Sequence, residues 1–263
     1  MPGLRTVAAT RYLTPLREGG SLPAIVEADD DGLYVLKFRG AGQGVKALVA
    51  ELLAGEIGRR LGLPVPEIVF AELDADLART EPDPEIQDLI RASAGLNFAI
   101  DYRPGALAFD PVADRMDADL ASRIVWFDAL IANLDRTPRN ANMLVWHRGP
   151  WLIDHGAAFY FHHDWDGFEA QAANAFPLIK DHVLLSTASR IEAVDAELAA
   201  RMGADVLRDI VGLVPDAWLA DPSFESAAQA GSPRDVYLRF LLQRLQAPRA
   251  FVQEAHRAHA LHV

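Results

Sequence analysis

Alternating apolar and polar residues near the start of the chain are typical of strands around one helix. Residues 24–38, AIVEADDDGLYVLKF, contain two apolar runs joined by an acidic turn that ends in glycine, which predicts a β-hairpin. Residues 45–61 have the apolar density of a helix, and a glycine and a proline follow them as stop signals. Residues 65–73 and 95–103 are further apolar runs of strand length. We therefore expect a β-rich region with one main helix.

The pattern becomes helical in the second half of the chain. Residues 117–134 place apolar side chains at helical spacing, and helical patterns also dominate residues 189–213 and 234–262. Residues 142–161 interrupt them with two short apolar runs, MLVW and WLIDH, on either side of a His-Arg-Gly-Pro turn. This half is predicted to be helical with one small hairpin.

Together these elements predict an α+β fold of two lobes. We place a β-rich N-terminal lobe at residues 1–105 and a helical C-terminal lobe at residues 106–263, because strand patterns give way to helical ones near that boundary. A total of 263 residues suits one large or two small domains.

Composition narrows the class of protein. With 51% hydrophobic and 24% charged residues the chain is ordinary and globular, and the absence of cysteine excludes disulfides, Cys-ligated zinc, iron–sulfur clusters and a thiol nucleophile. No apolar run reaches the roughly 18 residues of a membrane span, and the first residues lack the apolar core of a signal peptide. A net charge of −12 argues against a nucleic-acid partner. We expect a cytoplasmic protein without membrane contact.

The densest polar cluster in an apolar context lies at residues 133–159. Asp135 is followed five positions later by Asn140, and after the predicted hairpin comes Asp154. Phosphoryl transfer uses such a set: one carboxylate orients or deprotonates the acceptor hydroxyl, and an Asn and Asp oxygen pair holds Mg²⁺ against the phosphates. The simpler alternative is that both aspartates cap local turns, but the spacing of the whole arrangement favours the functional interpretation.

Lys37 stands out because only three of the 25 basic residues are lysines. In a strand it shares a face with Leu33 and Val35, so its ammonium lies over apolar surface unless an anion meets it. A phosphate and a helical carboxylate, Glu51 or Glu56, would satisfy it. The alternative is an edge-strand lysine that prevents aggregation.

Two further segments are candidates for nucleotide binding. The turn containing Gly19, Gly20 and Ser21 would let backbone N–H groups approach phosphates, although it is neither a Walker A loop nor a dinucleotide fingerprint. Apolar residues interleave with Ala99 and Asp101 just before the expected boundary between the lobes, which makes this stretch a candidate hinge against the nucleotide base.

The order of these parts resembles the HipA-like branch of the protein kinase-like superfamily, with a likeness to phosphatidylinositol kinases at Asp135-Arg136. The resemblance covers most of the chain from about residue 17 to residue 190. Its most specific segments are AELLAGEIGRRLGLPVPE (50–67), ANLDRTPRNANMLVW (132–146), LIDHGAAF (152–159) and IKDHVLL (179–185).

The resemblance implies a two-lobed protein kinase-like fold and a role for each candidate residue. Lys37 would contact the α- and β-phosphates of ATP with Glu51 as its ion-pair partner, Asp135 would be the catalytic base, and Asn140 and Asp154 would bind Mg²⁺. The implied reaction moves the γ-phosphoryl group of ATP to a hydroxyl, on Ser or Thr of a protein. A small-molecule or lipid acceptor is the second choice.

The chain departs from the family pattern in three ways. Asp154-His155-Gly156 replaces the Asp-Phe-Gly of ordinary protein kinases, and the glycine loop differs from that of the best-known HipA toxins. The chain is also much shorter than those toxins, so we expect their N-terminal subdomain to be missing and leave a regulatory protein partner open. HipA-like kinases can phosphorylate a serine in their phosphate loop, and Ser21 is the matching residue.

Two other interpretations stay open. His155, His162, His163 and Asp164 follow Asp154 closely enough to suggest a His/Asp metal hydrolase, although no HExxH motif occurs. The second is a kinase-shaped module that binds nucleotide without catalysis. It is disfavoured because every polar group expected of the enzyme is present.

Overall fold

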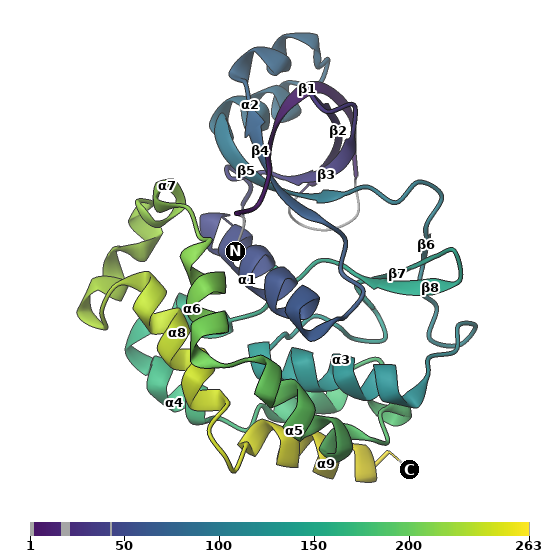
Figure 1. Cartoon of the computed structure of the whole chain (residues 1–263). Coiled ribbons are helices and arrows are strands. Elements are labelled where there is room, and N and C mark those ends of the chain that lie inside the picture. Colours follow the sequence, from purple (N-terminus) through teal and green to yellow (C-terminus); the bar gives the residue numbers. More distant parts are fainter. Residues whose placement is uncertain (1–2, 17–21, 43, 263) are drawn as a thin grey trace.

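A closed five-stranded barrel forms the N-terminal part of the molecule (Figure 1). The computed structural model describes residues 3–16, 22–42 and 44–262. The strands follow the order β1-β2-β3-β5-β4, and the barrel closes because β1 pairs antiparallel with β2 and parallel with β4. The strands are β1 (Thr6–Pro15), β2 (Ala24–Ala28), β3 (Leu33–Lys37), β4 (Ile68–Leu73) and β5 (Gly95–Asp101).

The predicted hairpin is confirmed, and its alternation decides which side chains enter the barrel. Tyr34 and Leu36 of β3 belong to the apolar cluster inside the barrel. Successive side chains of a strand point to opposite faces, so Val35 and Lys37 lie on the outer face, where Val35 packs against the larger core of the molecule. The Lys37 side chain therefore points away from the barrel interior, toward the rest of the molecule.

Helix α1 (Gly44–Leu61) lies between the barrel and the C-terminal helices (Figure 1). Two glycines let it approach the segment that leads into β4. A Cβ at position 55 would lie 2.4 Å from Cδ1 of Ile68, and one at position 58 would lie 2.9 Å from Cγ2 of Val65. A side chain at either position would therefore push α1 away from Ile68 and Val65. Most of α1 is buried in the same core as the C-terminal helices.

The C-terminal part is helical around a central helix, α3, and contains one small sheet. The sheet consists of β6 (Leu107–Ala108), β7 (Met143–Trp146) and β8 (Gly149–Leu152), in that order. The α-helices are α3 (Ala118–Ile131), α4 (Phe168–Ala173), α5 (Ile191–Arg201), α6 (Ala204–Gly212), α7 (Asp216–Leu219), α8 (Pro233–Arg244) and α9 (Ala250–Ala260). Short 3₁₀ turns connect several of them.

Some elements differ from the prediction for identifiable reasons. The helix expected at 189–213 is two helices, α5 and α6, separated at Met202-Gly203, and the one expected at 234–262 is likewise divided into α8 and α9. Helix α3 ends before residue 134 because Ala132 adopts the left-handed conformation, with φ of 50°. The sequence analysis missed β1 and helix α2 (Pro84–Ala92), which begins at the cap residue Asp83.

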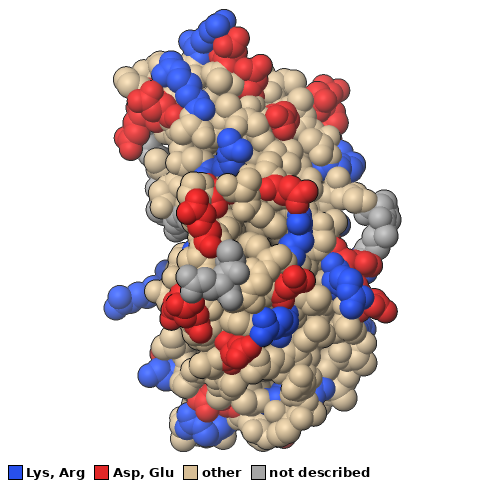
Figure 2. All heavy atoms as spheres, turned by 90° about the vertical axis from the view of Figure 1, so that its left-hand side faces the viewer, with Lys and Arg blue, Asp and Glu red and all other residues tan. Residues whose placement is uncertain are grey.

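The surface mixes charges of both signs. Figure 2 shows acidic and basic side chains interspersed over one face of the molecule rather than gathered into a single basic patch. In the part of the chain that the structure describes, no helix combines the length and the apolar character needed to cross a membrane.

Candidate functional site

The centre of the candidate site is a lysine held by two carboxylates from distant parts of the chain. Nζ of Lys37 lies 2.9 Å from Oε1 of Glu51 and 2.8 Å from Oδ1 of Asp154. Helical spacing alone left Glu51 and Glu56 open, and the family resemblance implied Glu51. Glu51 contacts Lys37, whereas Glu56 contacts Arg59 on its own helix. The lysine is not an exposed edge residue, because its side chain is only 8% exposed.

Lys37 stabilises the charge of Asp154 and is stabilised by both carboxylates, whereas burial raises the pKa of Glu51. Burial would lower the pKa of Lys37, but the carboxylates of Glu51 and Asp154 more than offset it and hold the pKa above the ordinary lysine value. Burial would raise the pKa of Asp154, but the Lys37 ammonium outweighs it and holds that pKa below the usual range. An ammonium carries three N–H donors, and two are directed to carboxylates, so one is left for a ligand.

The turn after β8 completes the partners of Glu51. Oε2 of Glu51 accepts a 2.9 Å hydrogen bond from the backbone N–H of His155, and Asp154 has a positive φ of 54° that turns the chain there. Burial lowers the pKa of His155 to about 3, so the ring is neutral at pH 7. The ring packs edge-on against Phe127 of α3, with centroids 5.7 Å apart. The imidazole thus fills an apolar position, as a phenylalanine would.

Asp135 lies in a loop that α3 leads into, and two asparagines orient it. Nδ2 of Asn140 donates to Oδ2 of Asp135 at 2.8 Å, and Nδ2 of Asn142 donates to the backbone carbonyl of Asp135 at 2.9 Å. The carbonyl of Asn142 in turn accepts from the N–H of Ile153, the residue before Asp154. Asn142 therefore connects the Asp135 loop to the strand end that carries Asp154.

A fully buried polar network under this loop was missed by the sequence analysis. Oδ2 of Asp128, on α3, lies 2.6 Å from Nε of Arg136 and 3.0 Å from Nε2 of His182. Oδ1 of Asp128 accepts from Nδ2 of Asn133 at 2.8 Å. Nδ1 of His182 accepts the N–H of Leu184, so the neutral ring donates through Nε2. This network fixes the residues on both sides of Asp135.

A signal for that network was present in the sequence. Asp128 is a lone carboxylate in the apolar run IVWFDALI, and Arg136 follows Asp135 directly. A buried carboxylate needs a cationic or hydrogen-bonding partner. The pairing itself depends on a histidine 54 residues away, so it could not be read from local spacing.

The free oxygens of Asn140 and Asp154 are of the type that suits a hard divalent cation. Asn140 uses its amide nitrogen on Asp135, which leaves its carbonyl oxygen, and Asp154 uses Oδ1 on Lys37. Carboxylate and amide oxygens are the donors that Mg²⁺ prefers. The described residues contain no cluster of three His, Asp or Glu side chains able to hold a metal ion. His162 is instead bonded to the hydroxyl of Tyr237.

The nucleotide-binding candidates lie in different surroundings. Gly19, Gly20 and Ser21 fall outside the described residues, between β1 and β2. Ala99 is buried in the middle of β5, where it pairs with one residue of β3 and one of β4. It is therefore an interior residue of the barrel sheet.

Asp101 lies at the end of β5, where the chain leaves the barrel. It forms an ion pair with Arg103, whose guanidinium carbon lies 4.2 Å from the ring centroid of Trp151 and 4.9 Å from that of Trp146. Nε1 of Trp146 donates to the carbonyl of Pro104 at 3.0 Å. The β7–β8 hairpin thus packs against the segment that connects the barrel to the helical part and bonds to it.

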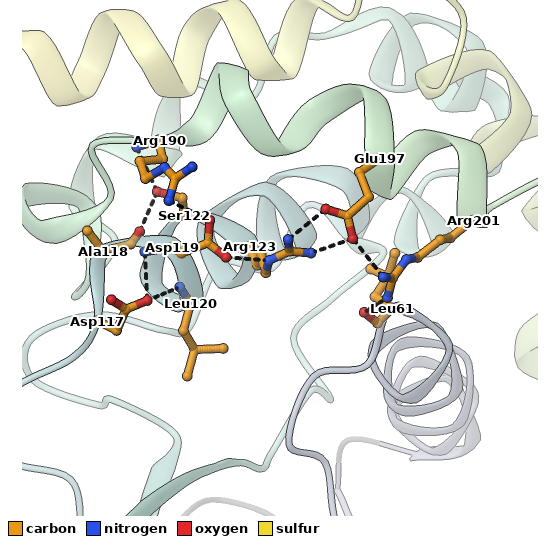
Figure 3. A network of polar contacts seen from close by, with 10 residues as sticks. All are labelled: Leu61, Asp117, Ala118, Asp119, Leu120, Ser122, Arg123, Arg190, Glu197 and Arg201. Carbon is orange, nitrogen blue, oxygen red and sulfur yellow. Dashed lines mark hydrogen bonds and ion pairs between the residues drawn. The ribbon is translucent and has the colours of Figure 1, made fainter.

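A second network ties the end of α1 to the helical part (Figure 3). Arg201 of α5 donates to the carbonyl of Leu61 at 2.9 Å, and it also contacts Glu197. Glu197 accepts from Arg123 of α3, which in turn contacts Asp119. Glu51 is therefore carried on a helix whose last turn is bonded to α5.

The chain is similar in fold to a solved structure of a kinase. The proinflammatory kinase CtkA of Helicobacter pylori superposes with a TM-score of 0.58 and 12% sequence identity, covering 99% of this chain and 99% of that chain. The Golgi casein kinase is more distant. Its structure with Mn/ADP bound gives a TM-score of 0.44 and 10% identity over 93% of this chain and 73% of that one. At such identities the likeness to CtkA establishes the fold alone.

Sequence comparison identifies the family. A search of curated protein sequences found no match. The model of one family, HipA-like kinase, matches residues 10–249, which is well over half of the chain. The protein therefore belongs to the HipA-like kinase family.

Proposed function

We propose that the protein transfers the γ-phosphoryl group of ATP to the hydroxyl of a Ser or Thr residue of a protein, with Mg²⁺ as the metal. The observation that carries this proposal is the contact of Lys37 with Glu51 and Asp154, which joins the barrel, α1 and the turn after β8. Such a buried cation beside an acidic metal donor is what the phosphates of a metal–nucleotide complex require.

The nucleotide would bind between two lobes, residues 1–105 and 106–263. The third N–H of Lys37 would donate to the α- and β-phosphates, while Glu51 holds the ammonium in place. Gly19, Gly20 and Ser21 would cover the phosphates with backbone N–H groups. The base would lie against the end of β5, near Asp101, whereas Ala99 is buried in the barrel sheet and does not contact it.

Asn140 and Asp154 would hold the metal through their free oxygens. Mg²⁺ there would neutralise charge on the β- and γ-phosphates. Lys37 keeps Asp154 ionised, because its ammonium holds the pKa of that carboxyl below the usual range.

Asp135 would act on the acceptor. Its carboxylate orients the hydroxyl and takes the proton as the acceptor oxygen bonds to the γ-phosphorus. The bond from the γ-phosphorus to the bridging oxygen breaks, and ADP leaves with that electron pair. The hydrogen bond from Asn140 to Oδ2 keeps the carboxylate aimed.

The test separates the two aspartates. The purified protein is incubated with labelled ATP, Mg²⁺ and a cell lysate, and label is followed in proteins and in small molecules. Asp135→Asn should lose nearly all transfer yet bind ATP with the Mg²⁺ dependence of the wild type, measured by calorimetry. Asp154→Asn should lose both transfer and that dependence.

Three results would overturn the proposal. Full activity in Asp135→Asn would contradict the role of Asp135 as the base. If ATP binding by Asp154→Asn keeps the Mg²⁺ dependence of the wild type, Asp154 is not a metal ligand. Label confined to the small-molecule fraction would show that the acceptor is a small molecule or lipid and not a protein.

A further inference from the structure

A pocket of about 170 Å³ lies beside the loop that carries Asp135. Its wall includes Leu134, the residue directly before Asp135. One wall of the pocket is therefore formed by the residue that adjoins the proposed base in the chain. The rest of the wall comes from segment 160–178 and from α8, with Phe161, Phe176, Leu178, Phe240 and Arg244 among its residues.

The mouth of the pocket exposes apolar side chains. Tyr160 is 56% exposed and Leu178 is 53% exposed, and both line the pocket. The described residues have six large exposed hydrophobic side chains in all, so two of the six gather at this one opening. Clustered exposed apolar surface marks a binding site more often than scattered residues do.

Arg244 lines the pocket, but its guanidinium already donates to backbone carbonyls and needs no anionic ligand. Nε donates to the carbonyl of Leu130 at 2.7 Å, Nη2 to that of Ala129 at 2.6 Å and Nη1 to that of Asn174 at 2.8 Å. The guanidinium thereby caps the last turn of α3 and fixes the chain after α4. Because backbone carbonyls satisfy it, an uncharged occupant suits the pocket better than a carboxylate.

The volume selects the class of occupant. Cavities that hold a whole small-molecule ligand span about 300–1,000 Å³, whereas a dry cavity of about 150 Å³ takes one benzene ring. About 170 Å³ therefore suits one large apolar side chain. A peptide in extended conformation advances about 3.3 Å per residue, so the positions to test are the nearest residues on either side of the acceptor hydroxyl.

We infer that this pocket selects the protein acceptor by binding a large apolar side chain, Leu, Met or Phe, close to the phosphorylated Ser or Thr. The inference rests on the proposed function and adds the acceptor's chemistry. It assigns to Leu134, Tyr160 and Leu178 a role in acceptor recognition, separate from ATP binding.

The experiment uses a peptide set with one central Ser in an Ala background. Leu, Met, Phe, Asp or Ala is placed in turn at each of the three positions on either side, and phosphate from labelled ATP is measured. We expect a large apolar residue at one position to raise transfer about tenfold over Ala or Asp, which is the order of one apolar contact. Leu178→Asp and Tyr160→Ser should each abolish this preference.

Val112→Asp is the matched control, because Val112 is 93% exposed and does not line the pocket. It should keep the wild-type preference. Transfer without any apolar preference, a preference for Asp, or a preference unchanged in both pocket variants would overturn this inference and leave the kinase proposal standing. Label on no peptide and on no lysate protein would contradict the protein acceptor itself.

Discussion

The Glu51 carboxylate accepts a 2.9 Å hydrogen bond from the backbone N–H of His155, 104 residues away. Its other oxygen holds Lys37 at 2.9 Å. One buried side chain of α1 thus joins a barrel strand to the turn that bears the proposed metal ligand. Helix α1 is also bonded to α5 through Arg201 and Leu61, so the helix that carries Glu51 is held at its other end by the helical part.

Replacing the cation should disable transfer and weaken the fold. Lys37→Met leaves Glu51 buried without its partner, and breaking a buried pair costs about 3–5 kcal/mol of unfolding free energy. Transfer should fall about 100- to 1,000-fold, as when one preorganised donor is removed. Urea unfolding and the labelled-ATP assay measure both effects.

The control for that variant is Lys180→Met, since the Lys180 side chain is exposed. It should change neither quantity appreciably. Wild-type turnover in folded Lys37→Met would contradict the role of Lys37.

Substituting the buried histidine by phenylalanine should stabilise the protein. Nε2 of His155 has no hydrogen-bond partner among the described residues although it is buried, and an unsatisfied buried polar atom costs about 1–3 kcal/mol. His155→Phe should raise the free energy of unfolding by about 1 kcal/mol and preserve transfer, because the backbone N–H still reaches Glu51. His155→Ala, which opens a cavity, should lower it. A destabilised His155→Phe would show that the ring is needed for more than packing.

Stability should decline as the solution becomes acidic. Burial holds the pKa values of His155, His162 and His182 below the ordinary value, to about 3 for His155. Below about pH 6.5 these imidazoles bind protons in the unfolded chain but remain neutral in the native protein. The contribution of these histidines to the free energy of unfolding is therefore fully present above that pH. It is lost as the pH falls toward their native pKa values.

The slope gives a quantitative check. Each such histidine contributes up to about 1.4 kcal/mol per pH unit. Urea unfolding of wild type and His155→Phe at several pH values between 4 and 8 should show a shallower decline in the variant. Identical slopes would contradict the account of His155.

Removing the carboxylate under the loop that carries Asp135 should be more damaging than a change to an exposed ion pair. Asp128→Asn leaves the guanidinium of Arg136 buried without a counter-charge, and we expect a loss of about 3–5 kcal/mol of unfolding free energy. Asp119→Asn is the matched control on the same helix. Its partly exposed pair with Arg123 should cost about 0–1 kcal/mol. Similar losses in the two variants would show that the buried network is not what holds the loop.

The sequence by itself determined much of the local structure. The acidic turn before Leu33 specified the hairpin, and the alternation around Lys37 placed its side chain outside the barrel. The spacing from Asp135 to Asn140 suits the hydrogen bond that the loop makes. These features are local, because periodicity and turn chemistry act over a few residues.

Only the tertiary structure decided the pairings between distant segments. It placed Glu51, which the family resemblance implied but helical spacing did not select over Glu56, against Lys37. It also brought Asp154 to the same ammonium across 117 residues. Both glutamates lie in one apolar helix, so helical spacing could not separate them. The choice follows from the rotation of α1 against the barrel, which Gly55 and its contact with β4 help to set. Such long-range packing leaves no signature in local sequence.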